Sequence, residues 1–143
     1  MRCRSVLVVV SALQLAVGVV GEVVALRRRT AYDFTPLGLR GEPAHVGRDS
    51  LALGTGLSAP VVMLATQGMA IRRLAIGPSR AAGRCLGVLG AGMVAGYLGE
   101  RGVRRRLTVA GWDPVESSVS VVGVVLSLAM AGVSVVAEAQ GGG

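Results

Sequence analysis

Four long apolar runs dominate the pattern of hydrophobic and polar positions along the chain. They cover residues 5–26, 50–71, 81–98 and 117–137, and the stretches between them are polar and rich in arginine, glycine and proline. A helix crosses a bilayer core of about 30 Å with about 20 apolar residues. Three runs reach that length, and the third is slightly shorter. The pattern predicts an all-α fold, a four-helix transmembrane bundle with antiparallel, up-down topology.

The composition favours one integral membrane domain over residues 1–143. Apolar residues make up 52% of the chain and charged residues only 16%, whereas about 25% of the residues in soluble domains are charged. The apolar runs also lack the charged face that a helix of a soluble protein presents to water. We therefore expect a multi-pass protein of the cell membrane, in contact with the lipid bilayer.

The positive charge of the chain lies between the apolar runs. All fifteen basic residues are arginine, and the net charge is +7. Arginines next to a membrane attract anionic lipid with about 1 kcal/mol each, so anionic lipid headgroups are the expected partner. The sequence contains no basic, aromatic-rich patch and no nucleic-acid-binding motif, and we expect no nucleic-acid partner.

The arginine distribution bears on orientation. Four crossings place both termini on one side, and the first loop (residues 27–49) and the third loop on the other. These two loops hold nine arginines, against six on the side of the termini, so the positive-inside rule favours termini outside the cell. The charged start at Arg2 and Arg4 favours the opposite orientation. The apolar run after it is long and lacks a clear cleavage site, which favours an uncleaved anchor over a signal peptide.

The aromatic residues all fall near the side with nine arginines. Tyrosine and tryptophan prefer the headgroup level of a membrane, so we expect these residues to anchor the bundle. A partner-binding or substrate-binding face is the alternative. The residues are Tyr32, Phe34, Tyr97 and Trp112.

Small residues predict how the helices pack. In a membrane, small side chains spaced four residues apart allow two helix backbones to approach closely. The third run is small on several faces, so we expect its helix at the centre of the bundle. Contacts between copies of the chain, or with another membrane protein, are the alternative use of these positions. They are Gly83, Gly87, Gly92, Gly96, Gly123 and Ser127.

Glu22 is the most informative single residue for function. It lies about one turn, or about 6 Å, inside the end of the first run, where a carboxylate is costly unless it is paired, hydrated or protonated. Antiparallel pairing places Thr55 at similar depth, with Ser58 and Ser120 nearby, and Pro60 predicts a kink in the second helix. We expect Glu22 to reach the interface and pair with Arg27 to Arg29 or with Arg104 to Arg106. The alternative is that Glu22 and these hydroxyl residues form a hypothetical polar pocket for a proton or a cation.

Other polar residues suggest structural roles. Gln14 and Gln67 lie inside apolar runs, where amides usually bond to other helices. Cys3 and Cys85 are expected near the same surface, as two unrelated thiols or, less readily, as a disulfide. A lone loop histidine, His45, suggests solvation rather than catalysis. No metal-ligand set, cofactor motif or catalytic motif is present in the sequence.

These observations favour a non-enzymatic membrane protein, a structural, accessory or partner-binding subunit. A small proton-coupled transporter or exporter that uses Glu22 is the alternative function. A membrane-embedded enzyme ranks third, because no catalytic set is visible.

Overall fold

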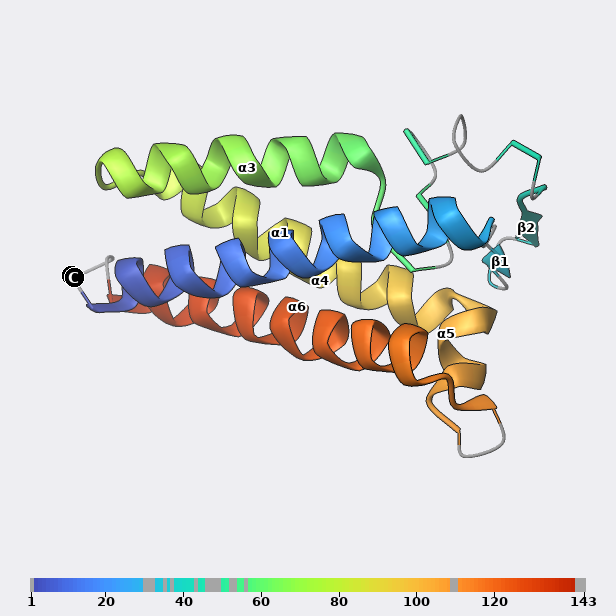
Figure 1. Ribbon diagram of the computed structural model, residues 1–143. Helices are drawn as coiled ribbons and strands as arrows, with labels where there is room; N and C mark the ends of the chain where they lie inside the picture. The colour runs from blue at the N-terminus through green and yellow to red at the C-terminus, as the bar shows by residue number, and fades with distance from the viewer. Residues whose placement is uncertain are drawn as a thin grey trace.

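The computed structural model describes residues 2–29, 33–34, 36, 38–42, 44–45, 50–51, 54–55, 57–108 and 111–140. These residues are mostly helical, which confirms the all-α class (Figure 1). The helices are α1 (Arg2–Arg28), α3 (Val61–Ile76), α4 (Arg80–Gly99), α5 (Arg101–Arg106) and α6 (Pro114–Gln140). A short antiparallel pair, β1 (Asp33–Phe34) and β2 (Leu39–Arg40), lies in the first loop.

The four longer helices run alternately in opposite directions and pack as a ring (Figure 1). α1 contacts α6 and α3, and α4 contacts the same two helices. The central position that we expected for the third helix is therefore wrong, because each helix of the ring has two principal neighbours. The two ends of the chain lie at the same end of the bundle, where the thiol of Cys3 donates to the side-chain oxygen of Gln140 over 3.0 Å.

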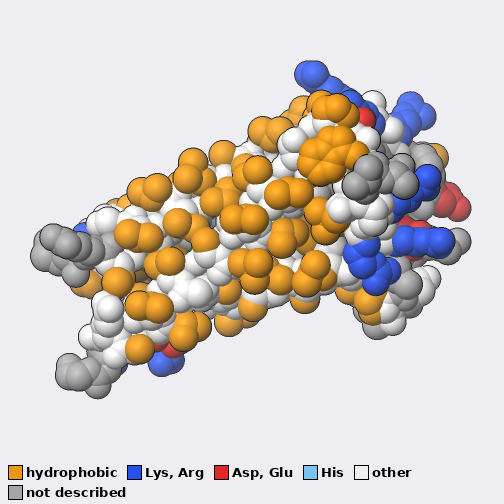
Figure 2. Space-filling view, turned by 90° about the horizontal axis from the view of Figure 1, so that it is seen from below, with side chains coloured by type: hydrophobic (Ala, Val, Ile, Leu, Met, Phe, Trp, Pro, Cys, Tyr) orange, Lys and Arg blue, Asp and Glu red, His pale blue; other side chains and the backbone are white. Residues whose placement is uncertain are grey.

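Three of these helices are long and apolar enough to cross a membrane. They cover Cys3–Arg28, Arg80–Gly99 and Pro114–Gln140, with mean hydropathies of 2.2, 1.3 and 2.4. Their surface is apolar: Val88 is 72% exposed, whereas Gln14 is fully buried. Figure 2 shows apolar side chains along the shaft of the molecule and most of the arginines gathered at one end. This distribution is the reverse of that in a soluble protein, which places its polar side chains outside.

The second apolar run departs most from the expected helix. We expected a helix over residues 50–71 with a kink at Pro60, but α3 covers Val61–Ile76. Proline lacks an N–H group and keeps the preceding residue extended, so it stands before the first turn rather than inside the helix. The first two N–H groups of α3 donate to the carbonyl oxygens of Ser50 and Leu51 over 3.0 and 3.3 Å. With 16 residues, α3 is about 24 Å long, shorter than a bilayer core.

α6 begins at Pro114, three residues before the expected start at residue 117. The carboxylate of Asp113 accepts hydrogen bonds from the N–H groups of Val115 and Glu116 over 3.0 and 2.8 Å. An aspartate cap followed by proline at the first helical position is a strong start signal. The cap places Glu116 in the first turn of the helix.

Candidate functional site

A buried polar layer connects three helices halfway along the bundle. The amide nitrogen of Gln67 on α3 donates to the side-chain oxygen of Gln14 and to the carbonyl oxygen of Ser11, both over 2.8 Å. The amide of Gln14 donates in turn to Ser127 of α6 over 3.3 Å. These four residues are fully buried. The layer is interhelical, as the sequence predicted, and it fixes the alignment of α1, α3 and α6.

The segment before α3 brings non-helical backbone against the middle of α1. The hydroxyl of Ser58 donates to the carbonyl oxygen of Gly18 over 3.0 Å. An ideal Cβ atom on Gly21 would lie 2.5 Å from the carbonyl oxygen of Leu57, so only glycine fits there. Gly54 turns the segment with a φ of +83°, a conformation that favours glycine. The described part of this segment is therefore held against α1 by close backbone contact.

Glu22 lies beside this segment and is 8% exposed. The hydroxyl of Thr55 donates to its Oε2 atom over 3.4 Å, and the hydroxyls of Ser50 and Ser58 are further polar neighbours of the carboxylate. The Oε1 atom is buried and has no hydrogen-bond partner within the described part of the chain. The result is a small buried cluster of one carboxylate and three hydroxyls.

The structure brings together most of the residues proposed for this pocket. Thr55 and Ser58 lie next to Glu22, as the depth argument suggested. Ser120 is buried, but its hydroxyl donates to the carbonyl oxygen of Glu116 in its own helix over 2.8 Å. Ser50 was missed, because a continuous helix from residue 50 would have placed it a full turn away from Thr55. The signal that could have found it is Pro60, which ends the segment.

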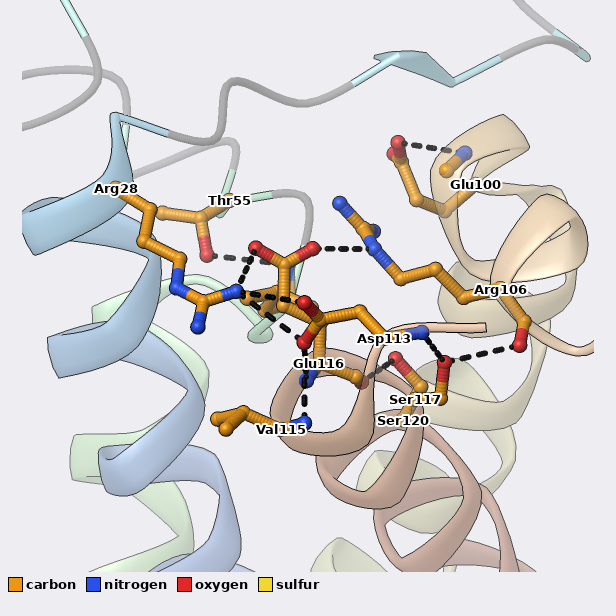
Figure 3. Close-up of polar contacts among 11 residues, drawn as sticks. Arg28, Thr55, Glu100, Arg106, Asp113, Val115, Glu116, Ser117 and Ser120 are labelled. Carbon is orange, nitrogen blue, oxygen red and sulfur yellow. Dashed lines mark hydrogen bonds and ion pairs between the residues drawn. The ribbon is translucent and has the colours of Figure 1, made fainter. Parts of the chain in front are cut away.

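Two of the arginines proposed as partners of Glu22, Arg28 and Arg106, pair with other carboxylates. Within the described residues no ion pair to Glu22 is found. Arg28 of α1 and Arg106 of α5 instead converge on Glu116 from opposite sides (Figure 3). The Nη1 atom of Arg28 is 3.2 Å from Glu116 and 3.2 Å from Asp113. This cluster joins the ends of α1, α5 and α6.

Asp113 belongs to the same cluster. The backbone N–H of Glu116 and the guanidinium of Arg28 hold the pKa of its carboxyl below the usual value. Ser117 links the cluster to the end of α5, since its hydroxyl donates to the carbonyl oxygen of Arg106 over 3.0 Å. The helix dipole stabilises a hydrogen-bonded carboxylate at the start of a helix. The cluster therefore has a structural explanation that needs no ligand.

Glu100 lies between α4 and α5 and caps the start of α5. Its carboxylate accepts hydrogen bonds from the N–H groups of Asp33, over 2.9 and 3.0 Å, and of Gly102, over 3.4 Å. Burial nevertheless raises the pKa of its carboxyl. An open cleft of about 460 Å³ adjoins it, lined by Asp33, Glu100, Arg101, Gly102, Arg105 and Arg106.

The glycines chosen from the sequence have different surroundings. An ideal Cβ atom on Gly87 would lie 2.5 Å from the hydroxyl of Ser134 on α6, and one on Gly123 would lie 2.8 Å from the hydroxyl of Tyr97. Gly92 has only Met63, at 3.6 Å. Gly83 and Gly96 have no atom within 4 Å of that position among the described residues. Gly87 and Gly123 thus serve packing within the chain, whereas Gly83 and Gly96 are open.

The aromatic residues also differ in whether their side chains are exposed or buried. Trp112 is 55% exposed at the arginine-rich end, as expected of an anchor. The expectation for Tyr97 was wrong, because it is buried against α6 at Gly123. Phe34 packs on Gly99 of α4. Tyr32 lies outside the described residues.

The remaining candidates form no centre of their own. Cys3 and Cys85 are free thiols. His45 is exposed and 3.2 Å from Glu42, three residues before it. Among the described residues, no group of histidines, cysteines and carboxylates could hold a metal ion. No protein-family model matches the chain, and neither does any curated protein or solved structure.

Proposed function

We propose that this chain is a multi-pass protein of the cell membrane with a structural or accessory role, and that its arginine end contacts anionic lipid. The arginine end comprises the exposed arginines at the end of α1 and on α5: Arg27, Arg28, Arg29, Arg101, Arg104 and Arg105. In this proposal α3 and the segment before it complete a fourth crossing. The positive-inside rule then puts the arginine end in the cytoplasm and the termini outside.

One observation carries the proposal: exposed arginines gather at one end of an apolar shaft (Figure 2). A juxtamembrane arginine contributes about 1 kcal/mol of attraction to an anionic surface. The exposed ring of Trp112 at the same end suits the headgroup level. A non-enzymatic role rests on the sequence, which contains no catalytic motif.

Lipid retention tests the proposal. The protein is placed in nanodiscs of phosphatidylcholine with phosphatidylglycerol, and the lipids that it keeps after transfer to detergent are measured by native mass spectrometry. We expect the double variant Arg101→Gln/Arg105→Gln to lose preference for phosphatidylglycerol by about 2 kcal/mol, about 30-fold. The matched control is Arg72→Gln/Arg73→Gln, at the other end, which should keep most of the preference.

Two results would count against the proposal. Equal retention of both lipids by the wild-type protein would reject the lipid contact and favour an acidic protein partner. Recovery of a folded monomer in the supernatant after high-speed centrifugation without detergent would reject the membrane location.

A second candidate function is favoured by one specific feature, the partnerless oxygen of Glu22 beside non-helical backbone. It is a small proton-coupled transporter or exporter. In transporters, substrate and ion sites lie where helices are interrupted within the membrane. Proteoliposomes with a pH-sensitive dye inside test this candidate, because Glu22→Gln should abolish proton flux while insertion and expression stay unchanged. Equal flux in both proteins would exclude it.

A further inference from the structure

The irregular segment before α3 lies deep along α1. Ser58 bonds to the carbonyl oxygen of Gly18, which is ten residues and about 15 Å from Arg28 along the helix. Leu57 is completely buried there. Non-helical backbone at such depth is tolerated only where protein covers it or where it lines a polar cavity. The segment therefore exposes polar groups to the interior of the bundle rather than to lipid.

The described neighbours of Glu22, among them the hydroxyl of Ser50, supply hydrogen bonds but no positive charge. The hydroxyl hydrogen of Ser58 is directed to backbone carbonyl oxygens, those of Gly18 and Ala59, over 3.0 and 3.1 Å. Thr55 donates over a long 3.4 Å. The Oε1 atom is buried without a partner among the described residues. An unpaired carboxylate is costly in such a place, so a positive charge or a proton is the missing partner.

The surroundings restrict the class of ligand. A second anion would be repelled by the carboxylate. A divalent cation usually takes several carboxylates, and Glu22 is the one acid of the pocket among the described residues. One carboxylate with hydroxyl oxygens suits a single positive charge.

We infer that the pocket formed by Glu22, Ser50, Thr55 and Ser58 binds a small monovalent cation, a proton or Na⁺, with the Glu22 carboxylate as its charged ligand. The inference deepens the transporter candidate, on which its physiological meaning rests, but binding can be measured without transport. Toward this end of the bundle, Arg28, Arg106, Asp113 and Glu116 are engaged with one another. Glu100 accepts hydrogen bonds from Asp33 and Gly102. The other described arginines of this end are exposed: Arg27, Arg29, Arg101, Arg104 and Arg105.

Infrared difference spectroscopy of the full-length protein in nanodiscs tests the inference. In the first arm, pH is varied from about 4 to about 10 without Na⁺. In the second arm, Na⁺ replaces choline at constant pH and ionic strength. We expect one carboxyl band that responds to pH, to Na⁺ or to both, and that disappears in Glu22→Gln. A response to pH alone identifies the proton, and displacement of the band by Na⁺ identifies Na⁺.

Matched variants separate the site from general effects. Glu138→Gln removes an exposed carboxylate at the other end of the bundle and should leave the band unchanged. If the ligand is Na⁺, Thr55→Val should weaken its binding about 3- to 10-fold, because one oxygen ligand is lost. Far-UV circular dichroism of each variant shows whether the helices are kept.

Two results would overturn the inference: no carboxyl band that responds to either cation, or identical difference spectra for the wild type and Glu22→Gln. The transporter candidate fails in a different way. If the band responds as expected but proteoliposomes show no Glu22-dependent flux, the binding site stands and transport is excluded.

Discussion

The contact between α4 and α6 at Gly90 gives the sharpest quantitative prediction. An ideal Cβ atom on Gly90 would lie 2.8 Å from the carbonyl oxygen of Ser127 and 2.9 Å from the backbone nitrogen of Ala131. Both are backbone atoms, which cannot turn aside as a side chain would. Gly90→Ala must therefore move the two helices apart. Overpacking of this kind costs about 1–3 kcal/mol.

Gly96→Ala is the matched control, on the same helix and six residues further on. No atom among the described residues lies within 4 Å of the position of its new Cβ atom. Alanine is favoured over glycine inside a helix by about 0.5–1 kcal/mol, and this gain is common to both variants. The difference in stability between them therefore isolates the overpacking cost, about 1–3 kcal/mol.

The assay is reversible unfolding in mixed micelles, with increasing dodecyl sulfate and helix content followed by circular dichroism. We expect Gly90→Ala to unfold at a lower fraction of dodecyl sulfate than the wild type, and Gly96→Ala at the same or a higher fraction. Equal stability of the two variants would refute the reasoning, since it would mean that the backbones of α4 and α6 are not in contact at Gly90.

Three further predictions concern charge and the open face of α4. Glu116→Gln weakens contacts to two arginines and should lower the free energy of unfolding by about 1–3 kcal/mol. Glu138→Gln, in an exposed pair, should lower it by less than about 1 kcal/mol. The same micelle titration measures both variants, and equal losses would contradict the difference in burial between the two glutamates. Burial raises the pKa of Glu100 in the folded protein above its ordinary value of 4.5, so the folded state holds the proton of this carboxyl more tightly than the unfolded state does. The contribution of Glu100 to stability is therefore full at pH values below its ordinary pKa and is lost as the pH rises through the raised pKa. Unfolding as a function of pH should therefore show a decline in the wild type that is missing in Glu100→Gln, and parallel curves would disprove it. Gly96→Leu should leave the fold intact but break any assembly of copies through α4, which size-exclusion chromatography with light scattering measures; loss of helix content in the monomer would show that this face is not open.

The apolar pattern alone predicted most of the helical structure. Runs 5–26, 81–98 and 117–137 correspond to α1, α4 and α6, each of which is longer than expected. Apolar content marks which residues avoid water, whereas capping residues mark where a helix ends. Asp113 with Pro114 and Ser79 before α4 are such signals in the sequence. If these residues are interpreted as helix caps, they predict where α6 and α4 begin.

The second run shows where apolar content misleads. Residues 50–60 are as apolar as a helix, but the chain before Pro60 is extended or turned in its described part. Apolar residues can be buried in a helix or in an extended segment. The restriction that proline imposes on the residue before it decides between these two conformations. The sequence contained this signal, and its interpretation as a kink was wrong.

The candidate site was predicted in part. The expected depth placed Thr55 near Glu22, as the structure has it, although Thr55 lies in the segment before α3 and not in the helix that this estimate assumed. Depth does not determine which way a side chain faces around the helix axis. Ser120 has a suitable depth, but its hydroxyl bonds to its own helix.

The sequence by itself determined the class of the fold, the three longest apolar helices and the concentration of arginine at one end, because each depends on residues close together in the chain. Only the tertiary structure decided the partners: Gln67 with Gln14, Arg28 and Arg106 with Glu116, and no ion pair for Glu22 within the described residues. Pairing depends on how each helix is rotated about its axis and on which helices are neighbours. Both are fixed by close contacts between residues far apart in the chain, such as Gly90 against α6.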